Sequence, residues 1–311
     1  MKISETAKLF LQKDNFLLLT HKNPDGDTLG SAAALCSALR RAGKTAYLFP
    51  NEQMTEKYRE FAEPYHAPTG YKAAFTVAVD IATEGLLPQD FEGKVDFCID
   101  HHPSNTHYAP KSLIAASKAS CGEVVLQLIK ALNGDLTQEE ANLLYVAVST
   151  DCGCFVYANT KADTFRAAAE LLDCGAENSR LNVKLFRKVS AARMKIEGLV
   201  YSGMEFYRDG QISVATITQQ MLREAEATED DLDDISGLAG RAEKAVLNIT
   251  VREKENGESR VSLRSAPGVD SCEIASVFGG GGHAMAAGCT IQAAPEKAKR
   301  MLLDVIDELW K

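Results

Sequence analysis

The sequence contains no run of about 18 uncharged apolar residues, the length at which a membrane-spanning helix becomes a candidate. Its first residues, Met1 to Glu5, lead straight into a mixed polar segment without the pattern of a signal peptide. It also has no internal repeat and no low-complexity tract. These absences argue against a membrane protein, and we expect a chain that works in the cytoplasm.

An excess of basic residues is also missing. The chain has 34 Lys and Arg against 43 Asp and Glu, a formal net charge of −9. Because coating long nucleic acids requires many contacts from Lys and Arg to phosphates, this composition argues against a protein that tracks along long duplexes. An acidic protein can still bind a small phosphate ester if metal ions and a few Arg or His residues supply positive charge.

The cysteines do not form a disulfide framework, because eight are scattered through 311 residues and such frameworks are typical of small secreted chains. We expect reduced, mostly buried thiols. Cys152 and Cys154 are the one close pair, and a single C-x-C is weak evidence for a zinc site.

The chain length predicts two domains, and the first alternates strands with helices. Its predicted strands are residues 16–20, 74–79 and 95–99. Its predicted helices are residues 28–41, 120–133 and, after the capping box of Thr137 and Glu140, the segment to about 150. This order predicts an α/β fold with a mostly parallel sheet and helices on both faces.

The second half predicts a smaller α/β domain. Residues 155–190 are predicted to be helical, residues 188–200 to be a connecting helix or linker, and residues 224–234 to be an acidic loop or solvated face. Residues 212–218 predict a strand, and residues 245–253 and 260–264 predict paired strands around Asn256-Gly257. We place the domain boundary near 190–200, which gives domains of residues 1–190 and 191–311.

Unusual polar residues stand at the ends of these elements. They are His21, Asp25, Asp27, Asp80, Asp100, His101, His102 and Asp151. Because the carboxyl ends of parallel strands line one crevice, we expect these side chains to meet. Four carboxylates in one crevice would repel one another and their pKa values would rise, and two divalent cations would resolve this.

Each of these residues also has a purely structural alternative. Asp25 and Asp27 suit a turn and a helix cap, and Asp80 suits a turn at a strand end. A single histidine is more often a satisfied structural residue than a ligand, and Asp151 could be a turn residue at a helix terminus. The metal hypothesis therefore depends on the whole set.

The order strand–H-x-x-x-D-x-D–helix, strand–D, strand–D-H-H and helix–D across residues 16–155 resembles the DHH phosphoesterase superfamily. Residues 279–283 (GGGGH), followed by Ala286-Ala287-Gly288, resemble the signature of the DHH-associated C-terminal domain. The two-domain layout is most similar to the branch of nanoRNases and pAp phosphatases, which cleave very short oligoribonucleotides and 3′-phosphoadenosine 5′-phosphate (pAp).

The resemblance implies a role for each residue of the set. His21 and Asp25 would bind one metal, Asp27, His101 and Asp151 the other, and Asp80 would bridge both. His102 would face the scissile phosphate, and Asp100 would orient a histidine. The resemblance implies two Mn²⁺ ions per chain, which suits a set of nitrogen and oxygen ligands without thiolate.

The resemblance also implies that the C-terminal domain holds the far end of the substrate in an interdomain cleft. The residues concerned are Arg264, Ser265, Gly281, Gly282 and His283. Glycines let backbone amides approach a phosphate, although a flexible loop is the alternative for this glycine run. Cys152 and Cys154 depart from the family, which more often has Ser, Thr or Gly around the last Asp.

The expected reaction is hydrolysis by a water that two metals activate, with nucleoside 5′-monophosphates as products. The expected partners are short oligoribonucleotides or mononucleotide bisphosphates, with neither long duplexes nor membranes, and a homodimer fits the sequence. The alternatives are a cyclic-dinucleotide phosphodiesterase of the same superfamily, a pyrophosphatase, a long-DNA exonuclease and a catalytically silent nucleotide-binding regulator.

Overall fold

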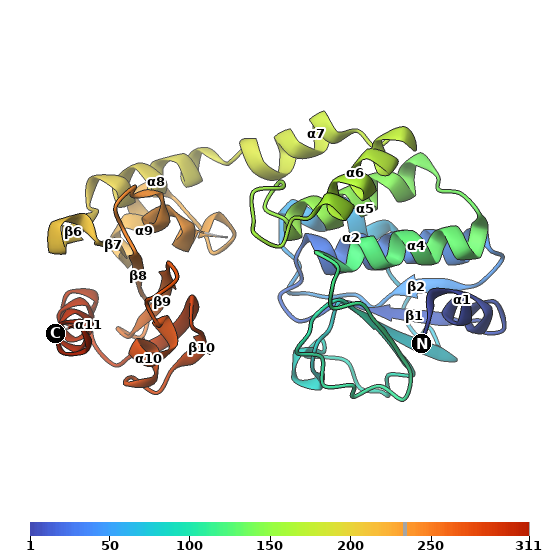
Figure 1. Cartoon of the computed structure of the whole chain (residues 1–311), viewed down its shortest axis with the longest axis horizontal. Coiled ribbons are helices and arrows are strands. Elements are labelled where there is room, and N and C mark those ends of the chain that lie inside the picture. Colours follow the sequence, from blue (N-terminus) through green and yellow to red (C-terminus); the bar gives the residue numbers. More distant parts are fainter. Residues whose placement is uncertain (233–234, 311) are drawn as a thin grey trace. The chain divides into compact units, whose positions relative to one another are not determined.

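The structure, a computed structural model, describes residues 1–232 and 235–310. The chain divides into two compact units: the first is Met1–Lys188, and the second begins at Val189. Each unit has its own sheet (Figure 1). Each also has its own hydrophobic core, and the two units are described separately. The acidic segment predicted as a loop, residues 224–234, includes residues 233–234, which lie outside the described residues.

The first unit contains a five-stranded sheet in which every neighbouring pair is parallel, in the order β2-β1-β3-β4-β5. This confirms the predicted parallel sheet. Its strands are β1 (Phe16–Leu19), β2 (Ala46–Leu48), β3 (Phe75–Val79), β4 (Phe97–Asp100) and β5 (Ser112–Ile114). Its main helices are α1 (Ile3–Leu11), α2 (Gly26–Arg41), α3 (Arg59–Ala62), α4 (Cys121–Asn133), α5 (Gln138–Asp151), α6 (Ala162–Asp173) and α7 (Asn178–Asn182).

One face of this sheet carries the helical layer. Phe16, Phe75 and Phe97 point from β1, β3 and β4 to Phe10 of α1, with ring centroids 5.4, 6.0 and 5.2 Å from that of Phe10. Burying four aromatic side chains together supplies a large part of the apolar area that holds α1 on the sheet. Helices α2 and α4 share this core with the sheet.

The opposite face of the sheet differs from the prediction of helices on both faces, because mainly loops cover it. Leu19, Ala78 and Cys98 point to that face and pack against connecting segments around Ile81 and Ala109. The connection from β3 to β4 contains only one short 3-10 helix, η3 (Glu84–Leu86), and β4 to β5 is joined by a loop. The expected helical layer is therefore replaced by loops whose apolar side chains cover the sheet.

Glycines set the spacing within the helical layer. A Cβ at Gly26 would lie 2.4 Å from Thr150 Oγ1, and one at Gly30 would lie 2.4 Å from the backbone oxygen of Leu143. A Cβ at Gly122 of α4 would lie 2.7 Å from that of Ala147. The missing side chains let α2 and α4 pack closely against α5, and this brings the start of α2 to the end of α5.

The second unit is built on a six-stranded mixed sheet in the order β10-β11-β9-β8-β7-β6. Its strands are β6 (Glu205–Tyr207), β7 (Ile212–Ile217), β8 (Leu247–Glu253), β9 (Ser259–Ser265), β10 (Gly281–His283) and β11 (Ala286–Ile291). Its helices of six or more residues include α8 (Ala191–Ser202), α9 (Gln219–Ala225), α10 (Ser271–Ser276) and α11 (Pro295–Leu309). β8 and β9 pair antiparallel, which confirms the predicted hairpin, and Gly257 adopts φ +80° in its turn.

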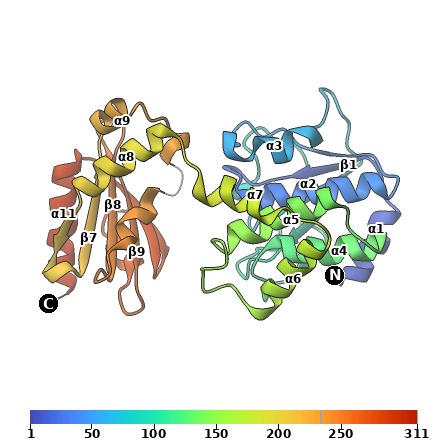
Figure 2. The same ribbon diagram turned by 90° about the horizontal axis from the view of Figure 1, so that it is seen from above.

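Side chains that alternate along the strands divide this unit into two cores. Figure 2 shows the helices α8, α9 and α11 beside the strands of this unit. Val214 of β7 faces α11, together with the buried residues of β8 and β9. Ala215 and Ile217 face the other way and pack with α8 and α9. A period of two along a strand explains why one short strand serves both layers.

Among the described residues, none of the helices combines the length and the apolar character that crossing a membrane requires. All eight cysteines are free thiols, as the sequence predicts.

Filling the gap at Gly30 should destabilise the protein. Gly30→Ala would place a methyl group against the backbone of α5, and overpacking of this kind costs about 1–3 kcal/mol. The matched control is Gly198→Ala in α8, where the added Cβ meets nothing within 4 Å beyond the adjoining residues and the backbone of its own helix, and alanine favours the helix by about 0.5–1 kcal/mol. Thermal or urea unfolding measures both variants, and equal effects of the two substitutions would contradict this account of the packing.

Candidate metal centre and nucleotide site

The cluster predicted from the sequence lies at the C-terminal edge of the parallel sheet. Its candidate ligand atoms form three groups, and within each group all atoms lie within 4.8 Å of one another. The groups are His21 with Asp25 and Asp80, Asp27 with His101 and Asp151, and Asp80 with Asp100, His101 and His102. The structure therefore brings together all eight polar residues that the sequence analysis selects.

The rings of His21, His101 and His102 are each held by a contact at Nδ1, so that Nε2 is available to a ligand. Nδ1 of His21 lies 2.9 Å from the backbone oxygen of Lys22, and Nδ1 of His101 lies 3.2 Å from that of Lys118. A carbonyl oxygen only accepts hydrogen bonds, so each Nδ1 carries a proton, and in the neutral ring Nε2 keeps the lone pair that a metal ligand needs. Nδ1 of His102 faces Asp100 Oδ1 at 2.7 Å, which leaves its Nε2 free in the same way.

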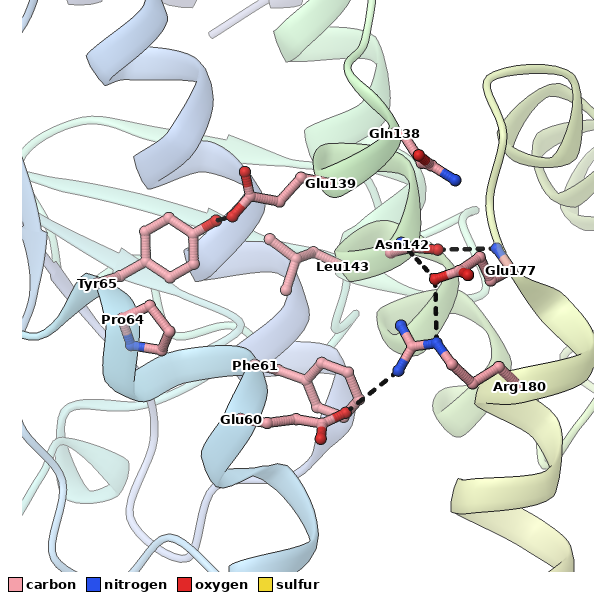
Figure 3. A pocket seen from close by; sticks show the side chains of 10 residues that line it. All are labelled: Glu60, Phe61, Pro64, Tyr65, Gln138, Glu139, Asn142, Leu143, Glu177 and Arg180. Atoms are coloured by element: carbon pink, nitrogen blue, oxygen red, sulfur yellow. Dashed lines mark hydrogen bonds and ion pairs between the residues drawn. The ribbon is translucent and has the colours of Figure 1, made fainter.

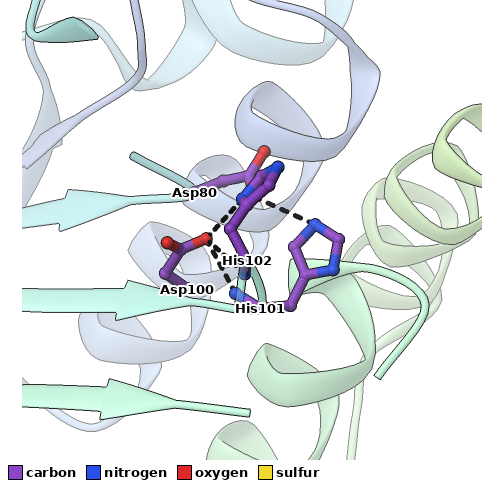
Figure 4. A group of neighbouring side chains, drawn as sticks. All are labelled: Asp80, Asp100, His101 and His102. Atoms are coloured by element: carbon purple, nitrogen blue, oxygen red, sulfur yellow. Dashed lines mark hydrogen bonds and ion pairs between the residues drawn. The ribbon is translucent and has the colours of Figure 1, made fainter. Parts of the chain in front are cut away.

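Asp100 is a buried carboxylate that orients the loop after β4 (Figure 4). Its Oδ1 accepts hydrogen bonds from the backbone amides of His101 and His102, at 2.7 and 3.2 Å, besides the ring of His102. Burial alone would raise the pKa of Asp100, but the hydrogen bonds of His102 and Asn105 hold it below its ordinary value. An ionised Asp100 fixes the tautomer of His102, and its hydrogen bond raises the pKa of that ring.

Asn105 is a member of the site that the sequence analysis missed. Its buried side-chain amide donates to Asp100 Oδ2 at 2.6 Å, and its Oδ1 accepts from the amide of His107 at 2.8 Å. An asparagine three residues after His102 is common in turns, so no signal in the sequence separates this role from that of a turn residue.

Asp27 connects the cluster to the start of α4. Its Oδ2 accepts from the amide of Cys121 at 2.7 Å, and its Oδ1 accepts from the amide of Gly122 at 2.9 Å and from Ser31 Oγ at 3.1 Å. The first amides of a helix have no partner within it, so a carboxylate there satisfies them. Even so, burial and then the charges of Asp151 and Asp25 raise the pKa of Asp27 well above its ordinary value.

Asp80 has a strained backbone, and one of its carboxylate oxygens lacks a hydrogen-bond partner. It follows β3 with φ +62°, a conformation that costs a non-glycine residue about 1–3 kcal/mol and that clusters at functional sites. Its Oδ1 and the Nε2 of His101 are both buried without a hydrogen-bond partner, and these two atoms lie 3.5 Å apart. Burial, and then the neighbouring carboxylates, raise the pKa of Asp80 well above its ordinary value.

Asp151 completes the group at the end of α5. Its Oδ2 lies 3.6 Å from His101 Nε2, and Asn159 donates to its backbone oxygen at 3.1 Å. Burial and the charge of Asp25 raise the pKa of Asp151 to about 7. Buried carboxylates, unpartnered ligand atoms and neutral imidazole nitrogens that point at one another are the environment that a divalent cation fits, because the cation supplies the missing charge.

The adjacent thiols fit this donor set poorly as ligands. Cys152 is fully buried, and burial raises the pKa of its thiol to about 12, so it is protonated at neutral pH. Thiol ligands bind as thiolates, and the three candidate groups contain only histidine and aspartate. The donors are therefore nitrogen and oxygen atoms, which suit Mn²⁺ or Mg²⁺ better than a soft metal.

In the second unit, strand register aligns residues that the sequence predicts to hold substrate. His283 of β10 lies opposite Ala286 of β11, which lies opposite Arg264 of β9, so these three residues form one row across the sheet. Arg264 and His283 are both exposed. A hollow of about 580 Å³ beside this row is lined by Arg260, Arg264, the glycines 279–281 and strand β11.

Packing requires glycine at two positions of the glycine run in this unit. A Cβ at Gly280 would lie 2.3 Å from the backbone oxygen of Gly288, and one at Gly282 would lie 2.4 Å from that of Ala286. Gly282 also adopts φ +149°. Ser265 Oγ lies 2.8 Å from the oxygen of Val269 and accepts a hydrogen bond from Ser271, so this hydroxyl holds the end of β9. Gly281 and Gly282 belong to β10, which pairs with β11, so the end of the run is part of the sheet.

Another hollow, of about 400 Å³, lies at the opposite end of α5 (Figure 3). Its lining is Glu60, Phe61, Pro64, Tyr65, Gln138, Glu139, Asn142, Leu143, Glu177 and Arg180. Gln138 begins α5 and Asp151 ends it, so this 14-residue helix separates the hollow from the metal cluster by about 20 Å. With three glutamates and one arginine, its lining disfavours a phosphate ester, and none of the residues predicted for the site lies there.

Comparisons with known proteins agree with this geometry. Residues 15–148 match the model of the DHH family, N-terminal domain, and residues 209–311 match the DHHA1 domain. The bifunctional oligoribonuclease and PAP phosphatase NrnA of Thermus thermophilus is 34% identical over 299 residues, which cover 94% of this chain and 89% of that protein. The protein of the same name from Bacillus subtilis is 26% identical over 302 residues and 94% of each chain.

Solved structures show the same fold. An exopolyphosphatase-related protein of Bacteroides fragilis superposes with a TM-score of 0.88 at 20% identity, covering 98% of this chain and 96% of that one. An exonuclease RecJ bound to manganese gives a TM-score of 0.54 at 14% identity, covering 94% and 90%. With both domain models matched in order and a 34% identical relative covered almost throughout, the chain belongs to the DHH family and carries a DHHA1 domain in its second half.

Proposed function

We propose that this protein is a metal-dependent phosphoesterase that hydrolyses short oligoribonucleotides to 5′-mononucleotides and pAp to AMP. The observation that carries this proposal is the pair of buried, unpartnered ligand atoms, Asp80 Oδ1 and His101 Nε2, at the centre of six candidate metal ligands. The names of the relatives from T. thermophilus and B. subtilis support the substrate class. We expect the enzyme to act in the cytoplasm, on substrates too short to need a basic track.

Two divalent cations, manganese by preference, would be held by His21 and Asp25 on one side and by Asp27, His101 and Asp151 on the other, with Asp80 shared. When bound, they supply an activated water and positive charge next to the phosphoryl group. The attacking water forms a new P–O bond, the ester P–O bond breaks, and the leaving oxygen takes a proton. No covalent intermediate with the protein is needed.

The chain's own residues would position the phosphate. His102, fixed by Asp100, would present its Nε2 to a phosphoryl oxygen, and its raised pKa favours the protonated form that donates to that oxygen. In the second unit, Arg264, His283 and the amides of Gly281 and Gly282 would hold the distal phosphate of the substrate. We propose that Ser265 supports this row indirectly, through the end of β9.

Removing the shared carboxylate should abolish the reaction. Asp80→Asn is the sharper substitution, because asparagine tolerates the positive φ of this position better than alanine does. We expect hydrolysis of pAp, pApA and a cyclic dinucleotide with Mn²⁺ to fall by at least about 10³-fold, measured by product identity. Circular dichroism and thermal unfolding should show a folded variant, and undiminished turnover would exclude the dinuclear mechanism.

The metal-free protein should lose stability as the pH rises. Asp27, Asp80 and Asp151 have raised pKa values in the folded state, so the fold binds more protons than the unfolded chain above pH of about 4. The free energy of unfolding should therefore fall as the pH rises from about 4 through about 7, the pKa of Asp151. Thermal unfolding with EDTA or with Mn²⁺ tests this, and the gain from Mn²⁺ should be larger at pH 8 than at pH 5.5.

A variant with Asp27→Asn is the control for this pH dependence, because it removes one of the crowded carboxylates and should flatten the curve. A metal-free stability that does not change between pH 5 and 8 would contradict the crowded-carboxylate account.

Arg264→Gln should weaken substrate binding more than it slows the chemical step. A charge-assisted hydrogen bond to phosphate is worth about 1.5–3 kcal/mol, so KM for pAp should rise about 10- to 100-fold while kcat changes much less. Arg300→Gln on the exposed side of α11 is the matched control and should leave KM unchanged. An unaltered KM in Arg264→Gln would remove this arginine from the substrate site.

A further inference from the structure

A hollow of about 270 Å³ lies beside the metal cluster, at the C-terminal end of β2. It is lined by Phe49, Pro50, Asn51, Glu52, Gln53, Pro88, Gln89 and Asp90. The side-chain amide of Asn51 donates to the backbone oxygen of His21 at 3.0 Å and to Thr20 Oγ1 at 3.1 Å. One wall of the hollow is thus hydrogen-bonded to the backbone of a proposed metal ligand. The hollow also follows the C-terminal end of β2, and parallel α/β folds bind ligands at the C-terminal edge of the sheet.

The wall is held in place by contacts of its own. Asn51 Oδ1 accepts from the amide of Gln53 at 3.1 Å, and the ring of Phe49 meets that of Phe91 edge to face, with centroids 5.6 Å apart. On the other side, the amide of Lys22 donates to the oxygen of Leu86 at 2.8 Å, which ties the segment before Pro88 to the residue after His21. The hollow is therefore formed by the fold before any ligand arrives.

The lining selects against a phosphate and for an uncharged ring. It contains no Lys or Arg, and its two carboxylates, Glu52 and Asp90, would repel an anion. It offers instead the exposed amides of Gln53 and Gln89, two proline rings and the edge of an aromatic ring. Amide side chains pair with the edges of nucleobases, flat apolar groups pack on their faces, and carboxylates accept hydrogen bonds from ribose hydroxyls.

We propose that this hollow is a nucleoside subsite, which holds the base and ribose of the nucleotide whose phosphate reacts at the metal cluster. The inference rests on the proposed function and deepens it, because it assigns the specificity for a nucleotide over a simple phosphate ester to the first unit. Gln53 and Gln89 contact the edge of the base. Since a glutamine amide offers a donor and an acceptor and pairs best with adenine, the subsite favours adenine nucleotides.

The test compares a substrate that has bases with one that has none. The double variant Gln53→Ala/Gln89→Ala and the control Gln127→Ala, an exposed glutamine on α4, are assayed with pApA and with bis(p-nitrophenyl) phosphate. The double variant should lower kcat/KM for pApA by about 10- to 100-fold and change that for the baseless ester by less than about 2-fold. The control should change neither.

Equal losses on the two esters, or full activity of the double variant on pApA, would overturn the subsite. A binding measurement separates this from failure of the proposed function itself. The Mn²⁺-loaded wild type should bind AMP at least about 10-fold more tightly than ribose 5-phosphate, and the double variant should lose that preference. If the wild type hydrolyses neither ester, the proposed function fails. In that case only the preference for AMP tests the subsite, and equal affinities for AMP and ribose 5-phosphate would refute it.

Discussion

The repulsion among buried carboxylates at one edge of a sheet is the constraint on which the rest of the first unit depends. Asp27 and Asp80 are almost wholly removed from water, and Asp25 and Asp151 stand beside them. Without a cation, the cluster keeps protons that exposed aspartates would release, so it is a site of stored electrostatic free energy. A divalent cation would remove that penalty by neutralising the carboxylates. Its binding would also place positive charge next to the phosphoryl group of a substrate.

Several side chains of the cluster also hold the fold together through hydrogen bonds. Asp25 caps α2 with hydrogen bonds to the amides of Asp27 and Thr28, Asp27 caps α4, and Asp100 fixes the loop that carries both histidines. Thr28 Oγ1 donates to the oxygen of Val79 at 2.8 Å, so the start of α2 is joined to the end of β3 just before Asp80. The ligands are therefore preorganised by hydrogen bonds that belong to the fold, which spares the entropy of ordering them when the metal binds.

Much of the first unit's fold and of the metal cluster was predictable from the sequence, because the patterns that specify them lie within short segments. The runs that became β1, β3 and β4 are apolar and end in His, Asp and Asp, and the capping box at Thr137 forms as predicted, with Glu140 accepting from the amide of Thr137. The strands β2 and β5 escaped prediction because three residues carry no usable period. The loop-covered face of the sheet escaped as well, since its apolar residues are spread among turns without helical spacing. Asn105 escaped because an asparagine in a turn has no pattern that sets it apart, although its contact with Asp100 is local. The row from His283 to Arg264 depends on the pairing of β11 with β9, which no single stretch of sequence specifies.

The carboxylate of Asp27 has a further consequence through its two amide partners. Both of its oxygens accept hydrogen bonds from backbone N–H groups, of Cys121 and of Gly122, while Oδ2 also lies 3.7 Å from His101 Nε2. Any change in the charge on that carboxylate, by proton or by metal, polarises those two amides. In isotope-labelled protein, the nuclear magnetic resonance signals of these two amides therefore report on the centre: they shift with a proton or with diamagnetic Mg²⁺, they broaden with paramagnetic Mn²⁺, and they need neither substrate nor inhibitor.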